Sequence, residues 1–443
     1  MSNRAKRKSL PQNAVETRIE SFAHDGRGVA HVDGKAVFID GALPGEQVSF
    51  FYTNIRRDFA EGRIGRVLVP APERVEPKCP HFDVCGGCSL QHLAEDAQIV
   101  EKQRLLLEQF RRLGKVEPEG WFPPLTGPRW GYRHKARLGV KYVAKKGKVL
   151  VGFREKASAF IAEIQSCPVL HPKVGERLGG LAELIEKLSV RDKIPQIEVA
   201  VGDERSALVF RVLTEPTQAD VDALREFGAR FDFDMYLQPQ GPESVFPLQP
   251  ENAPPLKYTL PNQGIEFRFK PMDFTQVNVA INRDMVDRVM AVLKPDAGDQ
   301  VLDLFCGLGN FTLPLARKCA FVTGIEGSRE SVARARQNAQ SNGIDNVEFH
   351  VADLTHPLDG VPWAERRYDK VLLDPSRAGA QAVLGLASRW GAARILYISC
   401  NPSTLARDAG ILVREHGYRL MRAGVMDMFP HTAHVESIAL FEK

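Results

Sequence analysis

The spacing of hydrophobic and polar residues changes twice along this chain of 443 residues, near residue 70 and near residue 270. Before residue 70, short apolar runs alternate with turn sequences such as Asp25–Gly26 and Pro44–Gly45, a pattern typical of short β-strands. The expected strands are Val15–Ser21, Gly28–Val32, Lys35–Ile39, Gln47–Asn54 and Gly62–Leu68. Strands of this length and number favour a small OB-like barrel over residues 11–69, a frequent platform for nucleic acids.

After residue 270, helical and strand patterns alternate, which predicts a doubly wound, mainly parallel α/β sheet of the Rossmann-like type. The expected helices are Asn282–Leu293, Asn310–Ala316, Ser328–Ser341 and Ala380–Trp390. The expected strands are Gln300–Leu304, Phe321–Glu326, Val347–Val351, Lys370–Leu373 and Arg394–Ser399. Ligands of such sheets bind beyond the carboxyl ends of the strands.

The middle region, residues 70–270, reads as a separate α+β domain. It opens with a proline-rich linker, Pro70–Pro77, and continues with an amphipathic helix over Leu93–Leu113 that we expect to pack on the last domain. From Tyr132 to Lys270, β runs surround one clear helix, Val174–Leu188. The chain is thus expected to hold three domains, with boundaries near residues 70 and 270.

Composition and charge narrow the class of protein. Hydrophobic residues make up 44% and charged residues 26% of the chain, as in ordinary globular proteins. No apolar stretch approaches a membrane span and no signal peptide is recognisable, so we expect a cytoplasmic protein with reduced cysteines. Residues 1–150 hold 26 Lys and Arg against 17 Asp and Glu, although the whole chain carries only +4. This basic first part, which begins with a tail at residues 1–10 that we expect to be disordered, favours a polyanionic partner.

A glycine loop, Phe305–Asn310, follows an expected strand and opens a helix, and it resembles the first turn of an S-adenosylmethionine methyltransferase. Glu326 ends the next strand, where a carboxylate can bind a ribose diol, and Asp353 follows the third strand, near an adenine edge. NAD is the rival ligand, but the loop lacks the third glycine that packs helix against strand around a pyrophosphate.

Cys400 ends an apolar strand and is the candidate nucleophile. Cys306 and Cys319 are expected to be core residues instead. Four motifs accompany Cys400: DLFCGLGN (Asp303–Asn310), DPSR (Asp374–Arg377), SCNP (Ser399–Pro402) and FPHTAHVE (Phe429–Glu436). With FKPMDFTQVN (Phe269–Asn278), they resemble the RNA uracil-C5 methyltransferases that make 5-methyluridine, and the resemblance covers Lys270 to the C-terminus closely. One departure is Ser376, where many relatives carry a second proline.

The resemblance implies roles for individual residues. The Cys400 thiolate adds to C6 of uracil, so that C5 can attack the methyl donor. Glu436 then removes the C5 proton, and Asp374 holds the N3/O4 edge of the base. The donor is S-adenosylmethionine, and its expected contacts are Gln276, Phe305, Asn310, Glu326, Asp353 and Asp374. We further hypothesise that Arg377 helps to stabilise the Cys400 thiolate.

A second group of cysteines lies in the middle region. Cys79, Cys85 and Cys88 fall within ten residues, and Cys167 is a distant fourth. Four thiolates suit either a [4Fe–4S] cluster or tetrahedral zinc, and spacing alone does not decide between them. The resemblance favours the cluster, because the subgroup that acts on 23S ribosomal RNA carries one at these positions. His431 and His434, which lack a third partner, are expected to make structural hydrogen bonds rather than to bind a metal.

The first domain resembles the TRAM domain, an RNA-binding barrel. Aromatic and cationic residues interleave there, as in a stacking surface; they are Phe50, Phe51, Tyr52, Arg56, Arg57 and Arg63. Since Phe50 and Tyr52 share one face of their strand, we expect these two rings to lie in the barrel core.

A TRAM barrel combined with the cluster resembles the 23S ribosomal RNA enzyme, so the expected substrate is one uridine of that RNA, uracil-1939. The alternatives are another ribosomal site, a tRNA, cytosine instead of uracil, or a non-catalytic RNA-binding iron–sulfur sensor. The intact Cys400 and Glu436 speak against the sensor. We expect a monomer whose partner is RNA and not a membrane.

Overall fold

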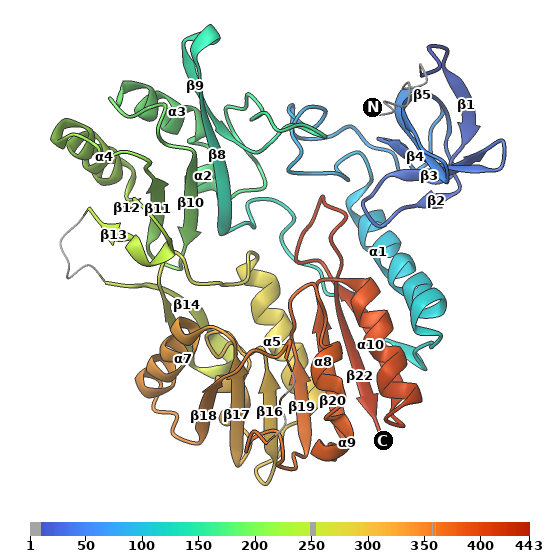
Figure 1. Cartoon of the computed structure of the whole chain (residues 1–443), viewed down its shortest axis with the longest axis vertical. Coiled ribbons are helices and arrows are strands. Elements are labelled where there is room, and N and C mark those ends of the chain that lie inside the picture. The colour runs from blue at the N-terminus through green and yellow to red at the C-terminus, as the bar shows by residue number, and fades with distance from the viewer. Residues whose placement is uncertain (1–9, 249–253, 357, 359) are drawn as a thin grey trace, which may run out of the picture. The chain divides into compact units, whose positions relative to one another are not determined.

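The computed structural model describes residues 10–248, 254–356, 358 and 360–443. The predicted basic tail therefore lies, except for Leu10, outside the described residues. The chain forms two compact units. The first comprises the chain up to Phe82 together with Cys88–Leu105 and Pro430–His434, and the second comprises Asp83–Gly87, Leu106–Phe429 and Val435–Lys443. Figure 1 labels most of their elements.

The first unit is built on a six-stranded sheet in the order β1-β5-β6-β4-β3-β2. Its strands are β1 (Val15–Arg18), β2 (Ser21–Phe22), β3 (Gly28–Val32), β4 (Lys35–Asp40), β5 (Gln47–Ile55) and β6 (Phe59–Val69). All neighbours are antiparallel except β4 and β6. The expected strands are therefore present, and the first of them is divided into β1 and β2.

Alternation along β5 separates the core of this sheet from its surface. Phe50 is fully buried and its ring meets Tyr52 edge-on at 4.9 Å, whereas Phe51 faces outward and is 41% exposed. A Cβ atom at Gly62 would lie 2.5 Å from the Phe50 ring, so only glycine leaves room for this packing. The expectation of a core position is confirmed for Phe50, whereas Tyr52 is half-buried and packs against the core.

One helix contributes to both units along its length. It consists of α1 (Glu95–Gln109) and one wider turn, Phe110–Gly114, and so agrees with the helix expected over residues 93–113. In the second unit, Gln109 accepts a hydrogen bond from Ser403 (3.1 Å), and the carbonyl of Gly114 accepts one from Arg414. The end of the helix therefore contacts the C-terminal sequence.

The second unit contains a central six-stranded sheet in the order β13-β12-β11-β10-β8-β9. Its strands are β8 (Lys135–Val143), β9 (Lys148–Gly152), β10 (Gln196–Val201), β11 (Ser206–Arg211), β12 (Asp234–Gln238) and β13 (Phe246–Pro247). Three helices belong to this region, α2 (Pro172–Gly175), α3 (Leu178–Lys187) and α4 (Gln218–Phe231). The prediction of a single helix is therefore wrong twice, because Val174–Leu188 is interrupted before Leu178 and α4 was missed.

A hairpin of β14 (Leu256–Leu260) and β15 (Ile265–Phe269) leads into an eight-stranded sheet in the order β18-β17-β16-β19-β20-β22-β21-β7. Its strands are β7 (Gly120–Trp121), β16 (Gln300–Leu304), β17 (Phe321–Glu326), β18 (Val347–Val351), β19 (Lys370–Leu373), β20 (Arg394–Ser399), β21 (Arg419–Met426) and β22 (Glu436–Glu442). Strands β16 to β20 are parallel, as predicted. β22 lies antiparallel between β20 and β21, an arrangement that the sequence pattern did not reveal.

The helices of this last region agree with the alternating pattern. They are α5 (Val279–Leu293), α6 (Thr312–Ala316), α7 (Arg329–Ser341), α8 (Gln381–Leu384), α9 (Ala387–Trp390) and α10 (Pro402–Arg414). The helix expected over Ala380–Trp390 is divided into α8 and α9, and α10 was not predicted.

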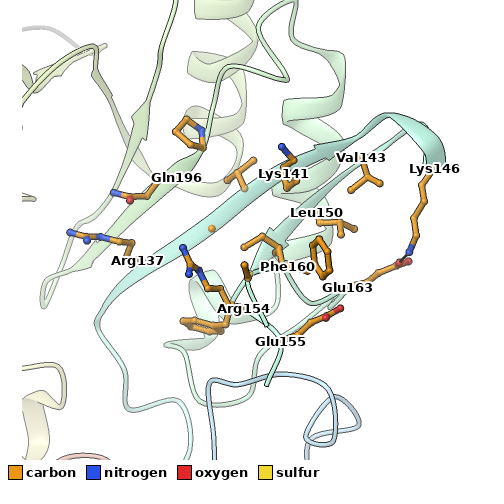
Figure 2. A pocket seen from close by; sticks show the side chains of 17 residues that line it. Arg137, Lys141, Val143, Lys146, Leu150, Arg154, Glu155, Phe160, Glu163 and Gln196 are labelled. Carbon is orange, nitrogen blue, oxygen red and sulfur yellow. Dashed lines mark hydrogen bonds and ion pairs between the residues drawn. The ribbon is translucent and has the colours of Figure 1, made fainter. Parts of the chain in front are cut away.

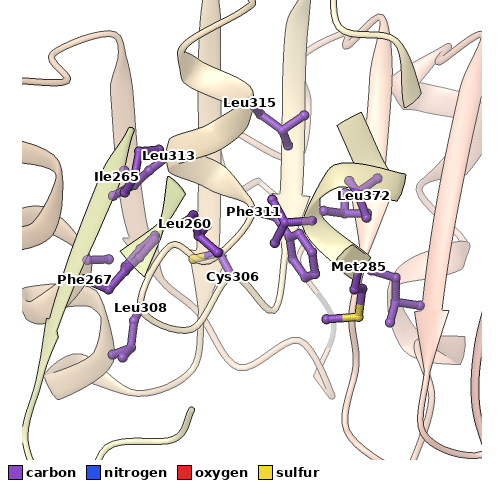
Figure 3. Close-up of a cluster of buried hydrophobic side chains, with 14 of the residues drawn as sticks. Leu260, Ile265, Phe267, Met285, Cys306, Leu308, Phe311, Leu313, Leu315 and Leu372 are labelled. Atoms are coloured by element: carbon purple, nitrogen blue, oxygen red, sulfur yellow. The ribbon is translucent and has the colours of Figure 1, made fainter. Parts of the chain in front are cut away.

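A hydrophobic cluster fixes the glycine loop on the sheet (Figure 3). Cys306, Leu308 and Phe311 project from the loop and the start of α6, and they are at most 4% exposed. They belong to one cluster with Phe267 of β15 and Met285 of α5. Burial raises the pKa of Cys306 well above its usual range, so this thiol is a packing residue, as predicted.

Candidate active site

Three parallel strands end at one edge of the eight-stranded sheet. Leu304 of β16 pairs with Leu373 of β19, and Leu373 pairs with Tyr397 of β20. Asp374 directly follows β19 and Cys400 directly follows β20. The pairing register therefore brings this acid and this thiol to the same strand ends, where α/β sheets bind their ligands.

The antiparallel strand β22 adds a second acid to this edge. Ser437 pairs with Ser399, and its hydroxyl donates to the Ser399 carbonyl at 3.1 Å. Because β22 runs against β20, its first residue, Glu436, lies beside the carboxyl end of β20. Glu436 is 5% exposed, and no described residue donates a hydrogen bond to its carboxylate.

Helix α10 begins immediately after the thiol. Asn401 is its N-cap and accepts a hydrogen bond from the Ser403 amide at 3.1 Å, and Pro402 occupies the first turn. The Asn401 side chain also donates to the Arg377 carbonyl at 2.9 Å. The Cys400 backbone is thus held between a strand and a capped helix.

Burial raises the pKa values of all three groups, and neighbouring charges add to the shifts of Cys400 and Glu436. Burial raises the pKa of Cys400 to about 11, and the charges of Glu436 and Asp374 act in the same direction, whereas Arg377 lowers it. Burial raises the pKa of Asp374 to about 7. Burial, and then the charge of Asp374, raise the pKa of Glu436 well above its usual range. Such clustering of shifted groups is typical of active sites.

The glycine loop lies at the end of the neighbouring strand β16. Phe305, Gly307 and Gly309 have φ angles of +68°, +56° and +88°, and left-handed backbone of this kind lets the chain turn sharply. The amides of Phe305 and Cys306 both donate to the Ile325 carbonyl, at 2.8 and 3.0 Å. The loop is therefore attached to β17, the strand that ends in Glu326.

Glu326 lies directly beside the loop. One of its carboxylate oxygens accepts from the Gly307 amide at 3.1 Å, and the other accepts from the Ser328 amide at 2.9 Å. Ser328 itself caps α7 by accepting from the Ser331 amide. Since Ser328 is the N-cap of this helix, Glu326 is not needed to cap it.

Asn310 is positioned by residues that sequence reasoning missed. Its side-chain oxygen accepts from the Tyr258 hydroxyl at 3.0 Å and from Asn282 at 3.1 Å, and its side-chain nitrogen donates to Asn282 at 2.9 Å. Tyr258 precedes Asn310 by more than fifty residues, and no local pattern connects the two.

The fully buried Asp303 accepts a hydrogen bond from Thr312 at 2.6 Å, and burial raises its pKa to about 7.

The remaining predicted donor contacts lie further along the chain. Gln276 is half-buried and stands two residues before Asn278, the N-cap of α5. Asp353 lies two residues beyond β18, and its side chain is 61% exposed. One of its oxygens accepts hydrogen bonds from the amide and hydroxyl of Thr355, and the other contacts His356 at 2.9 Å. Asp353 therefore stabilises its own turn.

The predicted metal site is not supported. Across the described parts of the chain, no three His, Cys, Asp or Glu side chains gather closely enough to hold a metal ion. Cys79 and Cys88 belong to the first unit, whereas Cys85 and Cys167 belong to the second. The described residues therefore show neither a [4Fe–4S] cluster nor the alternative zinc ion, each of which requires four converging ligands.

The segment before Glu436 belongs to the first unit. His431 is 1% exposed, and its amide donates to the side chain of Gln98 at 2.8 Å. Its carbonyl accepts from the amides of Ser89 and Leu90, both at 2.9 Å. His431 therefore has a structural role, as expected.

Comparisons with known proteins agree with this geometry. Residues 181–443 match the family model described as tRNA (Uracil-5-)-methyltransferase, and residues 13–64 match the TRAM domain. The chain is 62% identical to the 23S rRNA (uracil(1939)-C(5))-methyltransferase RlmD of Methylococcus capsulatus, over the whole of both chains. It is 55% identical to the protein of the same name from Alkalilimnicola ehrlichii, over 99% of this chain and 98% of the relative.

Among solved structures, the fold is similar to that of the Pyrococcus abyssi tRNA (uracil-54, C5)-methyltransferase in complex with S-adenosyl-L-homocysteine. The TM-score is 0.72 at 24% identity, and the match covers 96% of this chain and 99% of that one. At this identity the similarity concerns the fold alone. It supports the prediction of a methyltransferase sheet.

Proposed function

This chain belongs to the family of RNA (uracil-C5)-methyltransferases, and from this premise we propose that it methylates C5 of one uridine in 23S ribosomal RNA, uracil-1939. The methyl donor is S-adenosylmethionine, and the product is 5-methyluridine. The substrate is that named for relatives at 62% and 55% identity. The observation that carries the mechanism is the meeting of Cys400, Asp374 and Glu436 at one edge of the sheet.

The proposed reaction runs through a covalent adduct. The Cys400 thiolate forms a bond to C6 of uracil, and the electrons of the C5–C6 double bond move towards C5 and O4. C5 then takes the methyl group from the sulfonium donor, whose carbon–sulfur bond breaks. Glu436 removes the C5 proton, the double bond forms again, and the thiolate leaves C6.

Activation of the thiol is a requirement of this scheme. With a pKa of about 11, only about one Cys400 in ten thousand is a thiolate at pH 7. Arg377 acts in the required direction, because its charge lowers the pKa of the thiol. The two neighbouring carboxyls oppose ionisation, and their charges must be compensated when the base binds.

The acids have different proposed tasks. The raised pKa of Glu436 makes its carboxylate a stronger base towards the C5 proton. Asp374, with a pKa of about 7, exists in both forms near neutral pH. As a carboxylate it accepts from N3–H of uracil, and as a carboxylic acid it donates to O4, where negative charge develops.

The residues around the glycine loop fit the proposed donor site. S-adenosylmethionine supplies an electrophilic methyl group. A Cβ atom at Gly307 would meet nothing within 4 Å, so the space above the loop is free for a ligand. Glu326 faces this loop and can accept the ribose hydroxyls, and Phe305, Asn310 and Gln276 are the further proposed contacts. Asp353 must exchange its contact with Thr355 for the adenine edge.

We propose that the first unit binds the RNA backbone. Its sheet carries Arg27 over the Phe38 ring at 5.1 Å and Arg56 over the Phe59 ring at 5.8 Å. Cations placed over half-buried aromatic rings, as Phe38 and Phe59 are, suit a surface for single-stranded nucleic acid. No helix in the described residues is long and apolar enough to span a bilayer. The proposed activity on ribosomal RNA would take place in the cytoplasm. The proposal assigns no step to a metal.

The test uses purified protein, S-adenosylmethionine and a 23S ribosomal RNA fragment containing uracil-1939. We expect 5-methyluridine at that position, tritium release from [5-³H]uracil but not [5-³H]cytosine RNA, and a denaturation-resistant complex with RNA carrying 5-fluorouracil. Cys400→Ala abolishes all three signals, whereas the matched variant Cys319→Ala, in the hydrophobic core, retains them. Methylation by Cys400→Ala at the wild-type rate would disprove the mechanism, and methylation of tRNA but not of the fragment would disprove the substrate.

A further inference from the structure

A cavity of about 710 Å³ opens on the central sheet of the second unit, on residues that have no part in the proposed chemistry. It lies between the β8–β9 hairpin and the segment that follows β9, Arg154–Glu163. Figure 2 shows its labelled cations, Arg137, Lys141, Lys146 and Arg154, together with Phe160. The mixture of cations and an aromatic ring distinguishes this cavity from an ordinary apolar gap.

Two glycines shape the wall of the cavity. A Cβ atom at Gly139 would lie 2.4 Å from Ile161, and one at Gly152 would lie 2.7 Å from Ile164. Since both positions lack a side chain, the returning segment packs directly on the faces of β8 and β9. The cavity is therefore a consequence of close packing around it and not of a loose loop.

Phe160 is held at the cavity by a hydrogen-bonded turn. The Glu155 amide donates to the Phe160 carbonyl at 2.9 Å, and the Phe160 amide donates to the Ser158 hydroxyl at 3.1 Å. The side chain is nevertheless 75% exposed. A ring whose backbone is fixed and whose face stays in water is prepared for stacking, because burying it against a planar ligand removes apolar surface from water.

More cations than carboxylates line the cavity around this ring, which favours an anionic ligand. The cavity is lined by the cations Arg137, Lys141, Lys146 and Arg154 and by the carboxylates Glu155 and Glu163. Arg137 is paired with Glu198 at 2.6 Å and Lys146 with Glu163 at 2.8 Å. Lys141 and Arg154 are exposed and make no ion pair within the described residues. Two cations are thus available for phosphate groups.

We propose that this cavity binds an unpaired nucleotide of the RNA substrate, distinct from the uridine that is methylated. Its base stacks on Phe160, and the phosphates on either side contact Lys141 and Arg154. An aromatic ring flanked by unpaired cations is the combination by which proteins hold single-stranded RNA. The inference rests on the proposed function only for the statement that RNA is the substrate.

The first experiment measures equilibrium binding of the full-length protein to a single-stranded RNA oligonucleotide and to the 23S fragment, without methyl donor. Phe160→Ala is expected to weaken binding on the order of tenfold, the usual effect of losing one base–aromatic stack. Phe160→Trp is expected to retain binding. The matched control is Phe246→Ala, because Phe246 is also exposed, at 45%, but does not line the cavity. Wild-type affinity in Phe160→Ala would overturn the proposal.

Two further measurements separate the parts of the site. Lys141→Ala and Arg154→Ala are each expected to reduce the salt dependence of RNA binding by about one counterion. Heparin, a polyanion without bases, should bind Phe160→Ala as well as wild type. Equal weakening of heparin and RNA binding by Phe160→Ala would overturn the stacking.

Turnover with the 23S fragment distinguishes this inference from the proposed function. Phe160→Ala is expected to raise KM for RNA and leave kcat unchanged. If wild-type protein bound the oligonucleotide through Phe160 but did not methylate the fragment, the proposed function would fail and the cavity site would stand.

Discussion

Glu46 and Glu436 are both almost completely buried, at 0% and 5% exposure, yet their pKa values shift in opposite directions. Burial alone would raise the pKa of Glu46, but hydrogen bonds from Arg74 and from the amides of Leu43 and Ala71 lower it. Glu436 has no such donors among the residues that the structure describes, and burial together with the charge of Asp374 raises its pKa. A buried carboxylate with a full set of donors stabilises the fold, whereas one without donors is held ready for a proton.

The largest expected effect tests the functional member of this pair. Glu436→Gln should slow the release of 5-methyluridine on the order of 1000-fold, because a general base is lost. Methyl transfer itself still occurs, so a covalent complex of protein and ordinary, non-fluorinated RNA should accumulate on denaturing gels. The double variant Cys400→Ala/Glu436→Gln should show no complex. A complex that is absent in Glu436→Gln would contradict the assignment of the base.

Substitution of Glu46 should instead lower stability and leave the activity unchanged. Glu46→Gln removes the charge that binds Arg74 through two hydrogen bonds of 2.5 and 2.8 Å. We expect a loss of about 2–4 kcal/mol in the free energy of unfolding, the usual result of breaking a buried pair. Urea unfolding measures this change, and kcat at saturating RNA should not change. If Glu46→Gln lowered kcat and spared stability, the contrast between the two glutamates would be wrong.

Stability as a function of pH sharpens the comparison further. The pKa of Asp374 is raised to about 7, so its contribution to stability is present below its unfolded pKa of about 4 and is lost as the pH rises towards 7. The pKa of Glu46 is lowered, so its pH dependence is the reverse. Its contribution to stability is present above the pKa of the unfolded chain and is lost at acid pH. Asp374→Asn should therefore be more stable than wild type at pH 8, by up to about 4 kcal/mol for a shift of about three pKa units, and equal to it near pH 4. Equal differences at both pH values would refute the raised pKa.

The sequence predicted the position of this site better than its environment. Parallel strands must end at one edge, so the placement of Asp374 and Cys400 followed from the alternating pattern. The antiparallel strand that begins at Glu436 did not, because direction within a sheet is decided by tertiary pairing. The contact of Tyr258 with Asn310 likewise depends on the fold.

The errors have physical causes as well. Helix α4 has a recognisable start, since Thr217 and Asp220 form a capping box, but its apolar stripe is weak, because Leu224 is its only large apolar side chain that is fully buried. The cysteine spacing does not determine the ligand geometry or the presence of a metal. Whether residues as distant in sequence as Cys79 and Cys167 meet depends on the fold, and the described residues show no metal site. The spacing of cysteines in a sequence suggests which residues could be ligands, but it does not show where their sulfur atoms lie.

The smallest expected effect concerns Arg377, whose charge opposes the two acids. Removing it in Arg377→Ala should raise the pKa of Cys400 and slow its alkylation by iodoacetamide about twofold, since exposed charge pairs contribute about 0.5 kcal/mol. Glu436→Gln should accelerate the same reaction, because it removes a charge that raises the pKa of the thiol. The rate is measured from the Cys400 peptide by mass spectrometry, with Arg389→Ala, which breaks an exposed pair with Glu365, as the matched control. In wild-type protein the rate should rise about tenfold per pH unit up to the pKa near 11, and a plateau below pH 9 would show that the thiol is ionised far more readily than its burial dictates.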